Sequence, residues 1–181
     1  MKIGKNRRSY TRRLVEAALF AAICFGMTMV AVPLPVVGYG NLGDCFVLLS
    51  GWLLGPLWGA IAAGLGTALA DVALGYAIYA PATFLIKALM APIAFFVGKL
   101  LAGTSAGLLR RTAAHVCAAV LGEMVMIGGY FAYESVLYGV ATATGSLLGN
   151  ATQAVAGAVM STALISVIRG NKALNGMLEK K

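Results

Sequence analysis

Apolar residues along this chain fall into long runs, which are interrupted by short stretches rich in glycine, proline, tyrosine or charge. A bilayer core about 30 Å thick needs roughly 20 residues of helix to cross it. Four runs reach that length, and two on either side of Gly55-Pro56 fall short, so we expect those two to be tilted or distorted. The six predicted helices cover residues 14–33, 44–54, 57–74, 82–101, 112–133 and 146–168.

The basic residues orient these helices. Of the fourteen Lys and Arg residues, six precede the first apolar run and four follow the last. With a cytoplasmic N-terminus, the loops 55–56 and 102–111 also face the cytoplasm, and only Lys87 departs from that side. Cytoplasmic loops of membrane proteins carry an excess of Lys and Arg, so both termini are expected in the cytoplasm. The remaining loops, which then face outside, are 34–43, 75–81 and 134–145.

Composition supports a membrane protein rather than a soluble one. The chain is 60% hydrophobic and 11% charged, whereas a soluble domain carries about 25% charged residues. We predict an all-α integral membrane protein of six transmembrane helices in the cytoplasmic membrane. It forms one domain over 1–181, with a basic cytoplasmic N-terminus at 1–13 and a cytoplasmic tail at 169–181. The net charge of +8 lies where it favours anionic lipid headgroups, which argues against a nucleic-acid partner.

The sequence offers little for catalysis. It contains no phosphate-binding G-x-x-x-x-G-K-[ST], no G-x-S-x-G, no H-E-x-x-H and no C-x-x-C. His115 is the single histidine, and the three cysteines lack metal-ligand spacing. We therefore expect no catalytic residue, no metal site, no cofactor and no ATP hydrolysis by this chain.

Two charged residues fall inside predicted helices, where a charge costs roughly 2.5–3.5 kcal/mol at the membrane centre. Lys87 lies about two turns below the outer end of the fourth helix, and Glu123 lies near the middle of the fifth. Lys87 either reaches up to the interface, pairs with Glu123 or contacts a polar ligand. Glu123 either makes a structural hydrogen bond or contacts that ligand.

Further polar residues surround this pair toward the outside. Tyr130 and Glu134 continue the stripe that Glu123 begins on its helix, and Asn150 and Gln153 lie in the outer half of the last helix. Such residues predict a polar binding pocket, although tyrosines at this level also form an interfacial belt. The candidate binding residues are Tyr39, Asn41, Asp44, Tyr76, Tyr79, Lys87, Glu123, Tyr130, Asn150 and Gln153.

The first helix carries two overlapping pairs of small residues at helical spacing. They are Ala17 with Ala21 and Ala18 with Ala22. Small residues four positions apart allow helices to approach closely in a membrane. The stripe therefore serves either packing inside the bundle or docking of another protein.

With these residues the chain resembles the substrate-binding S components of energy-coupling factor (ECF) vitamin transporters. The resemblance covers nearly the whole chain and is most specific in four segments. They are GDCFVLL at 43–49, LLGP at 53–56, AGLGTALAD at 63–71 and GYAIYAPATFLIK at 75–87. Their order is similar to the branch labelled riboflavin-like S components.

This resemblance implies a non-catalytic subunit of an ECF-type ABC importer that binds a vitamin from outside with high affinity. It also implies docking through Ala17, Ala18, Ala21 and Ala22 onto a coupling transmembrane subunit that sits on two ATPase subunits. ATP binding and hydrolysis there would topple the S component and carry its site inward. Which alanine pair faces the partner stays open from the sequence.

The substrate also stays open. Lys87, Glu123, Asn150 and Gln153 suit a small polar heteroaromatic such as pyridoxine or a hydroxymethylpyrimidine. The small residues that line the last helix instead allow a roomy cavity for cobalamin or riboflavin. Two other classes of protein remain as alternatives, a self-sufficient secondary transporter and a membrane scaffold without a ligand.

Overall fold

The structure is a computed structural model that describes residues 3–33, 39–103 and 107–171. The side chains it describes begin at residue 10 and leave out 32–39. Three predictions therefore concern residues or side chains outside the described part of the chain: the role of Tyr39, half of the predicted loop 34–43, and the basic side chains before residue 10 and after residue 171.

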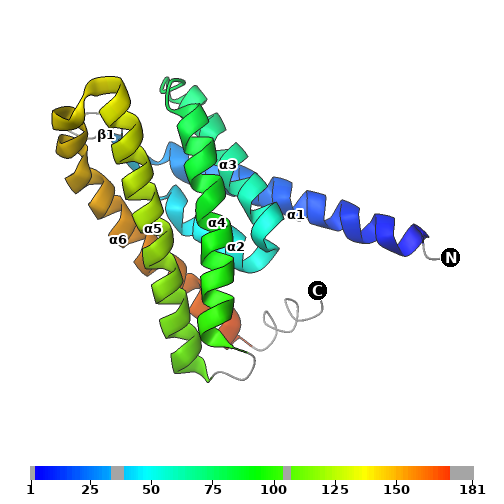
Figure 1. The fold of residues 1–181 in the computed structure, drawn as a ribbon. Helices are drawn as coiled ribbons and strands as arrows, with labels where there is room; N and C mark the ends of the chain where they lie inside the picture. Colours follow the sequence, from blue (N-terminus) through cyan, green and yellow to red (C-terminus); the bar gives the residue numbers. More distant parts are fainter. Residues whose placement is uncertain (1–2, 34–38, 104–106, 172–181) are drawn as a thin grey trace.

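Six helices and one small hairpin make up the described chain (Figure 1). The hairpin pairs β1 and β2 in antiparallel fashion, with Val32 opposite Gly40. The elements are α1 (Ile3–Met29), β1 (Ala31–Pro33), β2 (Tyr39–Asn41), α2 (Gly43–Leu54), α3 (Pro56–Ala73), α4 (Ala80–Ala102), α5 (Leu108–Tyr138) and α6 (Val140–Gly170). Six helices were predicted, and six are present.

The short helix α2 forms the centre of the fold. It packs against α1, α3, α4 and α6, and nine of its twelve residues are buried. A helix that is apolar on every side is stable only when it is surrounded in this way. Gly51 lies directly against the backbone of Ala91 on α4, because a residue without a side chain lets two helices approach closely. The break predicted at Gly55-Pro56 is confirmed: Gly55 adopts a φ of 85° and Pro56 begins α3.

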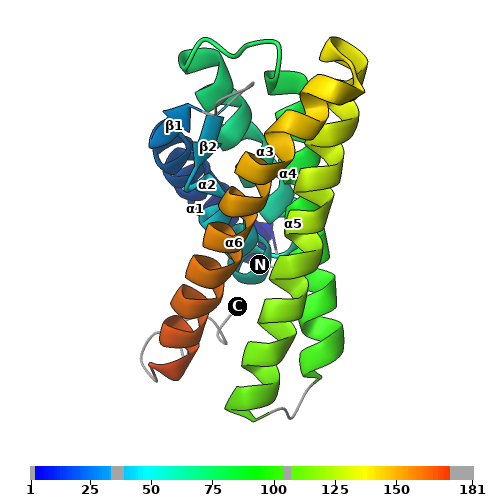
Figure 2. The same cartoon turned by 90° about the vertical axis from the view of Figure 1, so that its left-hand side faces the viewer.

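The helices α5 and α6 form a long antiparallel hairpin beside this centre (Figure 2). Here the predicted loop at 134–145 is wrong, because Gly139, with a φ of 86°, is the only residue between the two helices. Each helix has 31 residues, which at 1.5 Å per residue is about 46 Å and exceeds the bilayer core. The polar residues read as a loop therefore continue the helices, and Glu134 is a buried helical residue.

The helix α1 crosses the bundle, and its N-terminal half projects away from the other helices (Figure 1). It begins at Ile3, eleven residues before the predicted start. The apolar run marks only the part of a helix that fits lipid, and a helix can extend beyond it into water. Four helices, α3 to α6, are long and apolar enough to cross a membrane. Six membrane crossings and cytoplasmic termini stay predictions.

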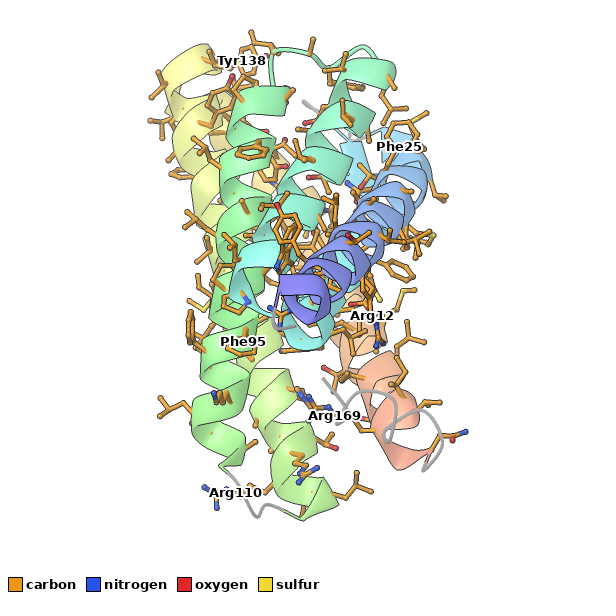
Figure 3. All side chains as sticks on the ribbon, turned by 90° about the vertical axis from the view of Figure 1, so that its right-hand side faces the viewer. Arg12, Phe25, Phe95, Arg110, Tyr138 and Arg169 are labelled. Carbon is orange, nitrogen blue, oxygen red and sulfur yellow. The ribbon has the colours of Figure 1, made fainter. Side chains whose placement is uncertain are left out.

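Charge separates along the bundle. Figure 3 shows Arg110 and Arg169 toward one end and Tyr138 at the other. The tyrosine-rich end contains the turn at Gly139 and the connection between α3 and α4. The separation matches the orientation that the basic residues predict.

Candidate binding site

The buried centre of the molecule holds an ion pair between Asp44 and Lys87. Asp44 lies in the first turn of α2, and Lys87 lies two turns into α4. Their side chains are 0% and 2% exposed, and the Lys87 ammonium donates to Oδ1 of Asp44. The interpretation that Lys87 reaches the membrane interface is therefore wrong, and its ion-pair partner is Asp44 rather than Glu123. Removing one partner of such a pair costs about 3–5 kcal/mol, because it leaves a buried charge without compensation.

A side-chain amide extends the pair to a third helix and to the hairpin. Gln153 on α6 donates from Nε2 to Oδ2 of Asp44 at 2.6 Å. Its Oε1 accepts the backbone N–H of Asn41 at 2.9 Å, and Oδ1 of Asn41 accepts the backbone N–H of Gly43 at 2.8 Å. This network ties β2, α2, α4 and α6 together through groups that are fully hydrogen-bonded or charge-paired.

Glu123 differs from these residues. Its side chain on α5 is 3% exposed, and neither carboxylate oxygen has a hydrogen-bond partner among the described residues. It lies against Gly157 on α6, where an added Cβ would collide with Oε1 of Glu123 and approach Cβ of Asp44 to 2.9 Å. Gly157 therefore provides the space that the carboxylate occupies, and the part of the chain that the structure describes supplies no donor for it.

Asn150 presents a second unsatisfied group. Its side-chain nitrogen Nδ2 is buried and lacks an acceptor among the residues described. Asn150, Gln153 and Gly157 follow one another at spacings of three and four, so they share one face of α6. A buried polar atom without a partner costs about 1–3 kcal/mol. The Glu123 carboxylate and the Asn150 amide are therefore available to hydrogen-bond to a bound molecule or to water.

Tyrosines gather next to this centre, around Tyr79. The ring centroid of Tyr79 lies 5.8 Å from that of Tyr133, 6.3 Å from that of Tyr76, and 6.4 Å from those of Tyr130 and Tyr138. Such separations are typical of tilted and edge-to-face aromatic packing. Burial and the neighbouring Glu134 carboxylate raise the pKa of Tyr79 above its ordinary value, so its hydroxyl remains a donor.

Tyr130 joins the aromatic group to the charged centre. The Lys87 Nζ lies 5.4 Å from the centroid of its ring, within the range of a cation–π interaction. Its hydroxyl shares a 2.9 Å hydrogen bond with Oγ1 of Thr83. Thr83 precedes Lys87 by one helical turn, a spacing that identifies it as a neighbour once Lys87 is singled out.

Four residues of this region, Thr83, Glu134, Ser146 and Gly157, were not among the candidate binding residues. Glu134, which sequence analysis assigned to the polar stripe but placed in a loop, accepts hydrogen bonds from Tyr79, at 3.3 Å, and from Ser146. Ser146 and Gly157 carried no signal of their own, and Thr83 carried only its spacing. The structure brings Asn41, Asp44, Lys87 and Gln153 into one network. Tyr76 packs against Tyr79 beside this network, and the Tyr39 side chain lies outside the described side chains.

The alanine stripe of α1 divides into an inner and an outer face. Ala17 is 4% exposed, and Ala21 is half-buried against Gly66 of α3. Ala18 and Ala22 are exposed on the opposite side. The pair Ala17 and Ala21 therefore serves packing within the bundle, while Ala18 and Ala22 remain accessible.

Fold and site together define a helical membrane protein that keeps an enclosed polar centre beside a group of aromatic rings. A family model described as the S component of an ECF-type riboflavin transporter matches residues 8–170. A protein of Pyrococcus woesei, described as an uncharacterized protein in a gap 3′ region, is 33% identical over 156 residues, which cover 82% of this chain and 95% of that protein.

A solved structure of the S component of a bacterial ECF transporter has the same fold. The two superpose with a TM-score of 0.71 at 19% identity, covering 89% of this chain and 97% of the other. The chain belongs to the family of ECF-type riboflavin transporter S components. It is thus a multi-pass membrane protein and the non-catalytic, substrate-binding subunit of a vitamin transporter, which confirms the resemblance drawn from the sequence.

Proposed function

We propose that the chain binds riboflavin from outside the cell with high affinity and delivers it through an ECF-type importer. The observation that carries this proposal is the buried Glu123 carboxylate, which has no donor among the described residues. The description of the matching family model as a riboflavin transporter S component supports the choice of vitamin.

Riboflavin has the chemistry that the unsatisfied groups require. Its flavin ring carries an imide N–H between two carbonyls, and its side chain carries several hydroxyls. A Glu123 carboxylate accepts from an N–H or a hydroxyl, while the Asn150 amide donates to a carbonyl. The tyrosines around Tyr79 provide aromatic surface for the ring system.

A smaller heteroaromatic such as pyridoxine fits the site less well. That preference depended on Lys87, Glu123, Asn150 and Gln153 as ligand contacts, and Asp44 engages two of these four, Lys87 and Gln153. Glu123 and Asn150 remain as candidate contacts. For cobalamin, the only argument remains the small residues of the last helix, and these suit riboflavin equally.

Delivery requires partners, and we propose that Ala18 and Ala22 form the docking face. The partners are a coupling transmembrane subunit and two ATPase subunits, and ATP hydrolysis there topples this chain in the cytoplasmic membrane. The exposure of this pair supports the choice, because Ala17 is buried against the bundle. Small exposed side chains let a partner helix approach closely.

Titration of the purified full-length chain with riboflavin, followed by quenching of flavin fluorescence, tests the substrate. We expect tight binding without ATP, and no displacement by excess pyridoxine, hydroxymethylpyrimidine or cobalamin. Glu123→Gln should weaken binding about tenfold, which is about 1.4 kcal/mol, and should raise thermal stability, because it removes a buried carboxylate without a donor. Glu16→Gln on α1, whose side chain is 23% exposed and pairs with Arg12, is the control outside the site. It should leave riboflavin affinity unchanged and alter stability by no more than about 1 kcal/mol.

Equal riboflavin affinity in Glu123→Gln and the unaltered chain would move the site elsewhere. Displacement of riboflavin by one of the smaller vitamins would replace the proposed substrate. No binding of any vitamin would instead support the scaffold alternative.

The docking face is tested by uptake. Ala18→Trp combined with Ala22→Trp should abolish riboflavin uptake by proteoliposomes that contain the whole transporter, while riboflavin binding stays unchanged. Bulky indole rings on this face keep the coupling helices apart. Ile23→Trp, on the exposed flank of the same helix, should retain most uptake. Loss of binding in the double variant would contradict a docking role, and uptake by this chain alone would indicate a secondary transporter.

A further inference from the structure

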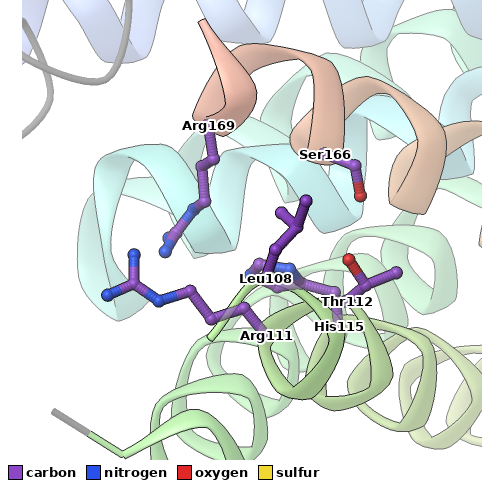
Figure 4. Close-up of a pocket in the computed structure, with 6 residues that line it drawn as sticks. All are labelled: Leu108, Arg111, Thr112, His115, Ser166 and Arg169. Atoms are coloured by element: carbon purple, nitrogen blue, oxygen red, sulfur yellow. The ribbon is translucent and has the colours of Figure 1, made fainter. Parts of the chain in front are cut away.

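A second polar site lies at the opposite end of the α5–α6 hairpin. A cavity of about 210 Å³ opens between the first turns of α5 and the last turns of α6. Figure 4 shows the side chains of Arg111 and Arg169 converging on it from the two helices. The residues that line it are Leu108, Arg111, Thr112, His115, Ser166 and Arg169.

The described lining of this cavity is basic. Two guanidinium groups line it, and its described lining includes no carboxylate. The N-terminus of α5 and the C-terminus of α6 contribute partial charges of about +0.5 and −0.5, which offset each other. The side-chain Nε of Arg110 donates a hydrogen bond to the backbone carbonyl oxygen of Leu101 at 3.0 Å. The guanidinium of Arg111, by contrast, forms no hydrogen bond or ion pair with a described residue.

The remaining polar atoms suit an anion with several oxygens. Thr112 and Ser166 contribute hydroxyl groups, and His115 contributes a ring that packs against Trp52 at a centroid distance of 4.7 Å. A guanidinium presents N–H groups in a planar fork that matches a phosphate. Two such forks on one side of the cavity form a binding site for a phosphate group, while the hydroxyls of Thr112 and Ser166 lie on the other side of Leu108 (Figure 4).

The surroundings of the cavity favour a lipid over free phosphate. Leu108 lines the cavity and is 65% exposed, and its neighbour Leu109 is 86% exposed. Exposed leucines beside a basic cavity accommodate acyl chains, which a soluble phosphate lacks. Basic pockets between transmembrane helices on the cytoplasmic side bind anionic headgroups. From these features we infer that this cavity binds the phosphate group of an anionic glycerophospholipid in the cytoplasmic leaflet.

Native mass spectrometry of the full-length chain, taken from nanodiscs of phosphatidylcholine mixed with phosphatidylglycerol, tests this inference. We expect the unaltered chain to retain phosphatidylglycerol selectively. Arg111→Gln with Arg169→Gln should lower that retention at least about tenfold, and Arg111→Lys with Arg169→Lys should lower it less, because lysine keeps the charge but lacks the fork. The matched control, Arg12→Gln with Arg13→Gln, removes two exposed charges from α1 and should retain the lipid.

Circular dichroism establishes that each variant is folded, and the lysine pair remains informative if the glutamine pair does not fold. Equal retention in all variants, or equal loss in the α1 control, would overturn the site. Displacement of the lipid by inorganic phosphate would show that the cavity takes free phosphate instead. Unchanged lipid retention together with failed assembly with the coupling subunit would reassign the cavity to an acidic protein segment.

Discussion

The α5–α6 hairpin borders two polar regions that neutralise charge in different ways. In the middle of the bundle, Lys87 and Asp44 pair directly and Gln153 completes their hydrogen bonds. At the end near Arg111 and Arg169, the cavity lining holds positive charge without a carboxylate. Where the fold excludes both water and lipid headgroups, the chain must supply its own counter-charges. Where water or lipid headgroups can supply counter-charges, the chain does not need to carry them itself.

The largest effect should follow from breaking the central pair. Asp44→Ala should lower the free energy of unfolding by about 3–5 kcal/mol, because Lys87 is then buried without a counter-charge. Reversible unfolding in detergent, followed by circular dichroism, measures this loss.

A double variant provides the control for that experiment. Asp44→Leu with Lys87→Met replaces the ion pair by apolar side chains of similar size and should be more stable than Asp44→Ala alone. A loss below about 1 kcal/mol in Asp44→Ala would contradict the description of the pair as desolvated.

An intermediate effect is expected at Gly157. Gly157→Ala places a methyl group against Glu123 and Asp44, so it should cost about 1–3 kcal/mol of stability and weaken riboflavin binding as well. Gly128→Ala on α5 is the matched control, because a Cβ there meets nothing within 4 Å. That control should gain about 0.5–1 kcal/mol from the better helix propensity of alanine. Equal stability of both variants would show that the site has room to spare beside Gly157.

The smallest effect is expected at the basic end. Arg111→Gln should change the free energy of unfolding by about 0.5 kcal/mol or less, because its side chain is partly exposed and has no charge partner among the described residues. Unfolding in neutral detergent measures this, in parallel with Asp44→Ala. A loss as large as that of Asp44→Ala would mean that the two regions do not differ in the way described.

Most of the fold was readable from the sequence. The apolar runs predicted all six helices, and Gly55-Pro56 predicted the break between α2 and α3. The errors concern helix ends: α1 begins earlier, and α5 and α6 continue through the predicted loop to Gly139. Hydropathy identifies the part of a helix that fits the lipid core. The helical backbone conformation can continue beyond that part, because polar residues outside the bilayer core do not interrupt it.

The site was readable only in part. Lys87, Asp44, Gln153 and Glu123 were all candidates, because polar residues in apolar helices are costly. Their pairing was not predictable: a pair of Lys87 with Glu123 was one of the alternatives left open, while the structure pairs Lys87 with Asp44. Partners more than forty residues apart depend on how α2 and α4 pack, which no local pattern records.

The sequence by itself determined the class of this protein: a helical membrane protein of the S-component family, with polar residues and an alanine stripe in defined helices. Only the tertiary structure decided which groups are satisfied and which are not. It placed Glu123 where no described residue donates to it, turned Ala18 and Ala22 outward, and brought Arg111 and Arg169 to one cavity. The physical reason is that composition and periodicity act along one helix, whereas hydrogen bonds, burial and charge balance arise between helices.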